Sequence, residues 1–201
     1  MSRTLHVVPI IHEEADLGRL AGPVRDELLA KAGAEAVARK DAVVAAAWDA
    51  IELWADSLGD ALSTHRVYQD GLPVSEHAER IVADLAQQGS RNHRLIESLV
   101  GRGATLVPTE DPALLVREYQ VIKAAIDAGR TPEPSSALLA ERDRFIAQRI
   151  NSTLPTGGTG VLFIGMLHRV GPGLSPDIEV RTPIEYLTSG DQPTDRPAEA
   201  G

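Results

Sequence analysis

The chain has no cysteine among its 201 residues, and this absence removes several kinds of site at once. Disulfide bonds, iron–sulfur clusters, zinc sites built on thiolates and a cysteine nucleophile are all excluded. A metal ion bound by this chain would therefore have only nitrogen and oxygen ligands.

Aromatic and basic residues are also in short supply. Phe, Trp and Tyr together make up 3% of the chain, and 20 Lys and Arg stand against 29 Asp and Glu, which gives a formal net charge of -9. Scarce aromatic residues leave little surface on which bases could stack, and an acidic surface repels phosphate backbones and anionic lipids. We therefore expect no nucleic-acid partner and no membrane partner.

Long apolar runs are missing as well. None approaches the roughly 18 to 20 residues of a membrane-spanning helix, and the first residues lack the charged and apolar regions of a secretion signal. With 43% hydrophobic and 24% charged residues, the composition is that of a soluble globular protein, and we expect it in the cytoplasm. The length fits one domain, which we expect over residues 1–187, followed by a disordered, polar tail at 188–201.

Short apolar segments alternate along the chain with segments of helical periodicity. This alternation is typical of an α/β fold, in which a mostly parallel or mixed central sheet is flanked by helices. Pro9 lies inside the first apolar segment and predicts an edge position or a bulge there, because proline cannot donate to a sheet. The predicted strands are 5–11, 65–70, 104–107, 161–164 and 178–180, and the predicted helices are 34–58, 75–88, 90–100, 111–129 and 136–154.

Two of the apolar segments have the same order of residue types. Residues 8–12 (Val-Pro-Ile-Ile-His) and 164–168 (Ile-Gly-Met-Leu-His) each place a histidine at the carboxyl end of a strand. Sites in open α/β sheets form beyond these ends, so neighbouring strands would bring His12 and His168 together. Two imidazoles with nearby carboxylates suit Mn, Co, Zn or Fe. The alternative is that each histidine only caps its own strand.

Carboxylates stand near the same strand ends. Glu13 follows His12 directly, Asp70 ends one predicted strand, and Glu110 comes shortly after another. Asp70 and Glu110 are candidate metal ligands beside the histidines, and Glu13 is the first candidate for a general base. For Asp70 and Glu110, a turn or capping role is the alternative.

One predicted helix carries a charge where an apolar residue is expected. Asp143 lies on the same helical stripe as Leu139, Ile146 and Ile150, and Arg142 stands next to it. A charge drawn toward a core needs a partner or a site to serve. The alternative is a local Arg–Asp network at the helix edge, which contributes about 1 kcal/mol.

The C-terminal part of the chain resembles a known family. Residues 141–181 look like the C-terminal part of the TraB/TIKI proteins, which belong with the erythromycin-esterase (EreA-like) and ChaN-like proteins to one broad superfamily. The residues that carry the resemblance are Glu141–Arg142–Asp143, Gly165–Met166–Leu167–His168, Gly171 and Gly173.

Members of this superfamily are described by two Gly-x-x-His motifs, a carboxylate and an Arg or Asn around a metal-dependent hydrolytic centre, and the TIKI proteins are metalloproteases. The resemblance implies that His168 is the histidine of the second motif and that Arg142 is the helical arginine. His12 takes the place of the first motif's histidine, with Pro9 where the family has glycine.

These features lead to one main expectation. We expect a metal-dependent hydrolase in which His12 and His168 hold a divalent cation together with one or more of Glu13, Asp70 and Glu110. The metal would lower the pKa of a bound water toward ~7 and polarise the scissile carbonyl. Glu13 would act as general base and Arg142, with Asp143 beside it, would stabilise the developing oxyanion.

The alternative is a non-enzymatic ligand- or ion-binding or regulatory protein that keeps the same pocket. If the protein is an enzyme, the bond that it cleaves is a peptide, an ester or an amide bond, and its substrate is a small molecule or a peptide. The Ala-rich helices suit packing in a homo-oligomer and in a monomeric core equally well.

Overall fold

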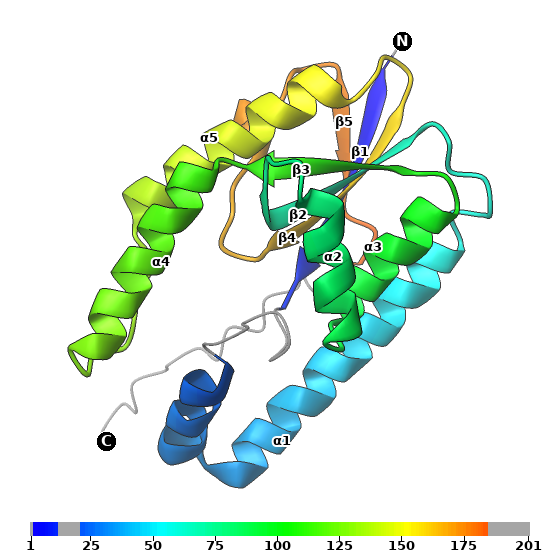
Figure 1. The fold of residues 1–201 in the computed structure, drawn as a ribbon. Helices are drawn as coiled ribbons and strands as arrows, with labels where there is room; N and C mark the ends of the chain where they lie inside the picture. Colours follow the sequence, from blue (N-terminus) through cyan, green and yellow to red (C-terminus); the bar gives the residue numbers. More distant parts are fainter. Residues whose placement is uncertain (1, 12–20, 185–201) are drawn as a thin grey trace, which may run out of the picture.

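The computed structural model describes residues 2–11 and 21–184, and for residues 21–32 it describes the backbone alone. As predicted, the fold is α/β: five parallel strands form one central sheet flanked by helices (Figure 1). The strands are β1 (Arg3–Ile10), β2 (His65–Pro73), β3 (Thr105–Glu110), β4 (Thr159–Gly165) and β5 (Ile178–Arg181). The helices are α1 (Ala21–Asp56), α2 (Ala78–Gln87), α3 (Arg91–Gly101), α4 (Pro112–Asp127), α5 (Ser136–Thr153) and the short 3-10 helix η2 (Gly171–Gly173).

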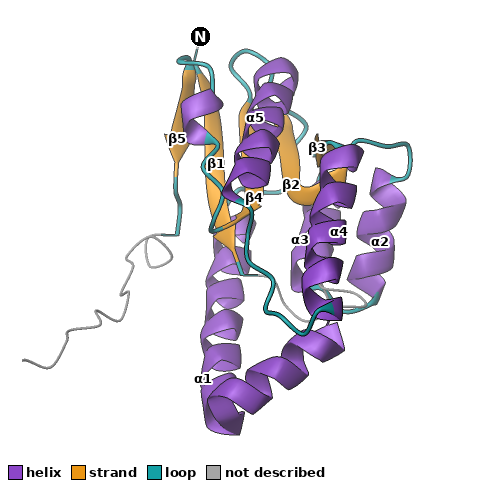
Figure 2. Cartoon of the chain, turned by 90° about the vertical axis from the view of Figure 1, so that its left-hand side faces the viewer, coloured by secondary structure: helices purple, strands orange, loops and turns teal. Residues whose placement is uncertain are grey.

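Helices cover both faces of the sheet (Figure 2). The alternation of side chains along β4 explains how: Val161 and Phe163 join the core cluster that includes residues of α1, α2 and α3, whereas Leu162 and Ile164 join the cluster that includes residues of α5. A strand that is apolar on both faces is buried on both faces, which is typical of a parallel sheet.

The strand order β3-β2-β4-β1-β5 places β4 between β1 and β2. The two segments that share a residue pattern are therefore neighbours, with Pro9 opposite Ile164 and Ile10 opposite Gly165. After β1 the chain continues to β2, on one side of this strand pair, and after β4 it continues to β5, on the other side. In open α/β folds, ligands bind beyond the carboxyl ends of the strands where the strand order reverses in this way.

The prediction from Pro9 holds only for the end of its strand. β1 lies inside the sheet, but β5 pairs with it only from Arg3 to His6. Beyond His6, β4 is the one strand among the described residues that pairs with β1, so within this part of the chain Pro9 lies where one side of β1 carries no ladder. This position suits a residue that has no amide hydrogen.

The predicted helices exist, with different ends. α1 reaches back to Ala21, and the predicted start after Gly33 corresponds to a kink, where Gly33 has non-helical backbone angles (φ 79°, ψ 162°). A left-handed φ of this kind is readily adopted by glycine. α2 begins at Ala78 rather than at residue 75.

Across residues 2–11 and 21–184, no helix has both the length and the apolar character to cross a membrane. The predicted tail at 188–201 lies outside the described residues.

Candidate active site

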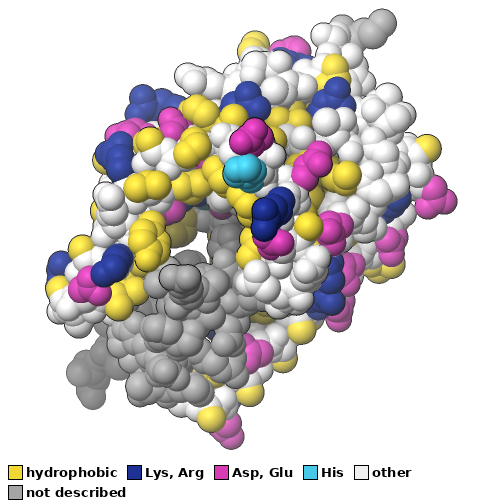
Figure 3. Space-filling model, viewed as in Figure 1, with side chains coloured by type: hydrophobic (Ala, Val, Ile, Leu, Met, Phe, Trp, Pro, Cys, Tyr) yellow, Lys and Arg dark blue, Asp and Glu magenta, His cyan; other side chains and the backbone are white. Residues whose placement is uncertain are grey.

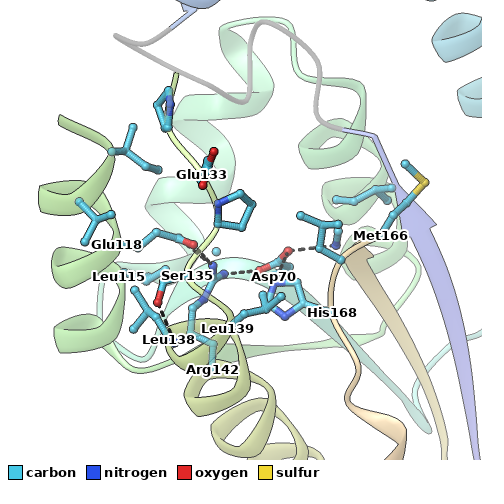
Figure 4. Close-up of a pocket in the computed structure, with 18 of the residues that line it drawn as sticks. Asp70, Leu115, Glu118, Glu133, Ser135, Leu138, Leu139, Arg142, Met166 and His168 are labelled. Atoms are coloured by element: carbon cyan, nitrogen blue, oxygen red, sulfur yellow. Dashed lines mark hydrogen bonds and ion pairs between the residues drawn. The ribbon is translucent and has the colours of Figure 1, made fainter. Parts of the chain in front are cut away.

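A cluster of charged side chains lies at the carboxyl ends of β2, β3 and β4, next to α4 and α5. Figure 4 shows Asp70, Arg142 and His168 pointing toward one another, with Glu118 on the other side of Arg142. The members of the cluster are Asp70 in β2, Glu110 at the end of β3, Glu118 in α4, Arg142 and Asp143 in α5, and His168 after β4.

Asp70 ties three elements together. The register between β2 and β3 shifts after Gln69, and Gly71 has a left-handed φ of 76°, so the strand bends directly after Asp70. Its Oδ2 accepts a hydrogen bond from the backbone amide of Gly165 (3.0 Å), and its Oδ1 accepts one from Nη2 of Arg142 (2.7 Å). Asp70 therefore holds the end of β4 and the middle of α5 against β2.

Arg142 is the cation at the centre of the cluster. Only 5% of its surface is exposed, and its guanidinium donates to three carboxylates on three elements. Nη2 lies 2.6 Å from Oε1 of Glu110, and Nη1 lies 2.6 and 2.7 Å from the two oxygens of Glu118. Nε also lies 3.2 Å from Oε1 of Glu110, so this carboxylate contacts two nitrogens of the guanidinium. Hydrogen bonds between charged groups of this kind are stronger than those between neutral groups.

His168 is held by a carboxylate on each side of its ring. Nδ1 lies 2.6 Å from Oδ1 of Asp143, whose Oδ2 accepts the backbone amide of Arg169 (2.8 Å). Nε2 lies 3.4 Å from Oδ2 of Asp70. Asp143 fixes the ring orientation, and an Nδ1–H donated to Asp143 leaves Nε2 facing Asp70.

The two most buried carboxyl groups, Asp70 and Glu110, have opposite pKa shifts. Burial raises the pKa of Glu110 to about 7, because Arg142 offsets the loss of water only in part and the neighbouring Asp70 adds to the rise. Burial also acts to raise the pKa of Asp70, but hydrogen bonding to His168 and the charges of His168 and Arg142 outweigh it and hold that pKa below its usual range. Of the two, Glu110 is thus the group that keeps a proton near neutral pH.

The two cations are stabilised in their charged forms. Burial acts to lower the pKa of His168, but the hydrogen bond and charge of Asp70 and the hydrogen bond to Asp143 raise it above its ordinary value. Burial also opposes the charge of Arg142, and the carboxylates of Glu110, Asp70 and Glu118 together raise its pKa. Four carboxyl groups surround these two cations, so the cluster as a whole attracts positive charge.

The donor set fits a divalent metal ion. One atom each from Asp70, Glu110 and His168 lie within 4.8 Å of one another. The 3.4 Å between Nε2 of His168 and Oδ2 of Asp70 is close to the ~3.3 Å expected for two ligands on one tetrahedral ion with bonds of about 2.0 to 2.1 Å. Nη2 of Arg142 hydrogen-bonds both Asp70 and Glu110, so Glu110 could bind an ion only if Arg142 shifted.

The cluster forms one wall of a pocket of about 560 Å³. Asp70, Glu118, Arg142 and His168 face it, whereas Glu110 is fully buried behind them. Side chains at the end of β1 and from α4 and α5 complete the lining. A pocket with a few convergent polar groups and perturbed pKa values is the usual form of an active site.

The structure brings together five of the seven residues proposed from the sequence: Asp70, Glu110, Arg142, Asp143 and His168. The other two, His12 and Glu13, lie outside the described residues. Their neighbour Ile11 lines the pocket, because β1 runs beside β4.

Two details differ from the sequence interpretation. Arg142 and Asp143 do not form the local pair considered above: Arg142 binds Asp70, Glu110 and Glu118, while Asp143 binds His168 and Arg169. The third carboxylate on Arg142, Glu118, was not predicted. It lies at helical spacing between Leu115 and Ile122, the same signal that identified Asp143.

No family model, curated protein or solved structure matches the chain.

Proposed function

We propose that this chain is a hydrolase that cleaves an ester, amide or peptide bond at the cluster around His168, with a divalent cation (Mn, Co, Zn or Fe) bound by His168 and Asp70. The observation that supports it is the buried arrangement Asp143–His168–Asp70 at the wall of the pocket, at hydrogen-bonding and metal-ligand distances. We infer that it acts in the cytoplasm.

The residues of the chain have separate tasks in this proposal. Asp143 accepts a hydrogen bond from Nδ1–H of His168 and so keeps Nε2 turned toward Asp70 and the pocket. Arg142 faces the pocket with part of a guanidinium that three carboxylates already orient. A fixed positive group of this kind stabilises the negative charge that develops on a carbonyl oxygen.

A divalent cation, when bound, would supply a water molecule of lowered pKa and polarise the carbonyl. Asp70 and His168 are its first ligands in the proposal, with Glu110 behind them. His12, outside the described residues, is proposed as a further ligand. Glu13, which lies outside the described residues, remains the candidate general base.

Arg142 favours a second candidate, a hydrolase that works without metal. Its Nη2 binds both Asp70 and Glu110, which is where a small cation would also bind. In this version His168 is the general base: Asp143 raises its basicity, and Nε2 takes the proton of the attacking water.

Metal analysis separates these candidates. The chain is purified without a His-tag, its metal content is measured, and binding of Mn²⁺ and Zn²⁺ is followed by calorimetry. His168→Ala and His12→Ala are compared with His77→Ala, a matched control whose exposed imidazole pairs only with Glu76. Hydrolysis of simple esters, anilides and peptides is measured on the same samples.

The main proposal expects one bound ion per chain and metal-dependent turnover, both lost in His168→Ala and kept in His77→Ala. Turnover that needs His168 but no metal supports the second candidate instead. Stoichiometric binding without turnover on any substrate supports the non-enzymatic, ion-binding alternative. Protein that binds no metal and hydrolyses nothing overturns both hydrolase proposals.

A further inference from the structure

The pocket beside the cluster is lined mainly by aliphatic side chains. They come from the end of β1, from α4, from the loop before α5, from α5 itself and from the turn after β4. Hydrophobic side chains also gather along α4 and α5 on the surface seen in Figure 3. The apolar residues of the lining include Ile11, Leu115, Leu138, Leu139, Met166 and Leu167.

The charges around the pocket are unsuited to an anion. Among the described residues that line it, the charged side chains besides His168 are Asp70, Glu118, Glu133 and Arg142. The guanidinium of Arg142 is already paired with Asp70, Glu110 and Glu118, so a phosphate or carboxylate would have to compete with three carboxylates for it. An anionic group would meet more negative than positive charge at short range.

The types of apolar side chain in the lining further restrict the chemical class of ligand that the pocket suits. Leucine, isoleucine, valine, proline and methionine form the apolar lining, and no Phe, Tyr or Trp is among the described residues that face the pocket. Aromatic rings in a ligand would therefore lack stacking partners, whereas an aliphatic chain gains from burial against any of these side chains.

Resting on the proposed hydrolase function, we propose that the substrate is a neutral ester or amide with a linear aliphatic acyl chain, and that this chain lies in the aliphatic pocket with its carbonyl at His168 and Arg142. Hydrolysis adds one water across the acyl bond and gives a carboxylic acid and an alcohol or amine. The acid loses its proton to water, and the resulting carboxylate is repelled by Asp70 and Glu118, which favours product release.

Binding is tested on the full chain as purified, with no metal added, by calorimetry with a matched pair of probes. Octanamide and octanoate share the same chain length and differ in charge at the end that meets the cluster. We expect octanamide to bind and octanoate to bind at least about tenfold more weakly. Equal binding of the two, or no binding of octanamide, overturns the inference.

Two leucine variants locate the bound chain. Leu167 lines the pocket yet is 59% exposed, and Leu53 on α1 is 73% exposed and does not line it, so both tolerate a polar side chain. Leu167→Gln is expected to weaken octanamide about tenfold, the scale of one lost methylene-sized contact in an apolar pocket. Leu53→Gln is expected to have no effect. The same affinity in both variants overturns the assignment of the pocket.

Hydrolysis of para-nitrophenyl octanoate is compared with that of para-nitrophenyl acetate, so that the substrate class and the proposed hydrolase function are tested separately. Preference for the octanoate ester, lost in Leu167→Gln and kept in Leu53→Gln, supports both. Hydrolysis that needs His168 but does not prefer the longer chain, with octanamide unbound, overturns the substrate class and leaves the hydrolase. Tight octanamide binding without hydrolysis of any ester overturns the hydrolase and leaves the pocket as a binding site for neutral aliphatic acyl groups.

Discussion

Arg142 is surrounded by carboxylates from three different elements, so its charge stabilises the fold as well as the site. Asp70, Glu110 and Glu118 lie in β2, β3 and α4, and Arg142 pairs with all three of them. A buried ion pair costs desolvation, but removing one partner leaves the others as uncompensated buried charges.

Substitution of this residue should therefore destabilise the protein strongly. Arg142→Met is expected to lower the free energy of unfolding by about 3 to 5 kcal/mol in urea denaturation. The control is Arg117→Met, because Arg117 pairs with Glu141 on the surface, and such pairs contribute about 0 to 1 kcal/mol. Similar losses in the two variants would mean that the three carboxylates do not depend on Arg142.

Part of this loss should be recovered by a second change. Glu110 is the carboxylate that keeps its proton most readily, since burial raises its pKa to about 7. In the Arg142→Met background, Glu110→Gln replaces it with a neutral group of the same shape. The double variant should be more stable than Arg142→Met alone at about pH 9, where the carboxyl group ionises, and equally stable at about pH 6, where that group is already neutral. Equal stability of the two at both pH values would contradict a charge effect at Glu110.

Asp143 acts on the reaction through His168. Asp143→Asn keeps the size of the side chain but replaces the oxygen pair that receives Nδ1 of His168 and the amide of Arg169. Loss of such a partner typically lowers metal affinity or activity about 10- to 100-fold. The imidazole of His168, followed by NMR, should change its tautomer or titration in the variant, a readout that a loss of stability alone does not produce.

At the scale of elements, α4 is attached to the rest of the molecule by few buried contacts. Ala125 is its one buried residue, and its link to the cluster runs through Glu118. The helix starts at Pro112, with the side chain of Asp111 accepting the amide of Ala113 at 2.7 Å. The sequence predicted this start from the Asp–Pro pair.

Loss of this cap should weaken the helix. Asp111→Ala is expected to lower the free energy of unfolding by about 1 kcal/mol, and hydrogen exchange should rise in α4 more than in α5. Asp111→Ser provides the control, because serine also accepts a hydrogen bond at this position. An equal effect of the two substitutions would show that the cap does not hold α4.

The part of the site that lies at strand ends could be predicted from the sequence. Asp70 and His168 follow apolar strands, and parallel strands present their carboxyl ends at one edge of the sheet. The pairing of Arg142 with Glu118 could not be predicted in this way. It depends on how α4 packs against α5, and helical periodicity gives the buried face of each helix but not the neighbour that this face meets.

At the scale of the whole molecule, two histidines away from the cluster, His6 and His65, make the folded state less stable at low pH. His6 in β1 and His65 in β2 each have a buried Nδ1 that finds no hydrogen-bond partner among the residues that the structure describes. Burial lowers the pKa of both below the ordinary 6.5, and positive neighbours add to the shift: Arg181 and His65 for His6, and Arg102 for His65. The folded state therefore binds fewer protons than the unfolded state below this pH.

The sign of the resulting pH dependence follows directly. As the pH falls through 6.5, His65 binds a proton in the unfolded chain but stays neutral in the folded protein. The free energy of unfolding therefore falls until the pH reaches the lowered pKa of the folded state. His168 contributes in the opposite direction, because its pKa is raised. His65→Gln leaves His168 unchanged, so the variant should lose less stability than the wild type between pH 7 and pH 5 in urea denaturation. An identical pH profile would rule out this role for His65.

The position of β4 between β1 and β2 also has a consequence for the order in which the protein folds. The two strands that flank β4, β1 and β2, are complete by Pro73, but β4 itself begins only at Thr159. Contacts between residues so distant in sequence close large loops and form slowly. During synthesis, β1 and β2 therefore expose unpaired edges until the last quarter of the chain has emerged, a state prone to aggregation. His168 follows that last central strand directly, so the pocket closes only after the sheet does, and no half-built site can act on a substrate.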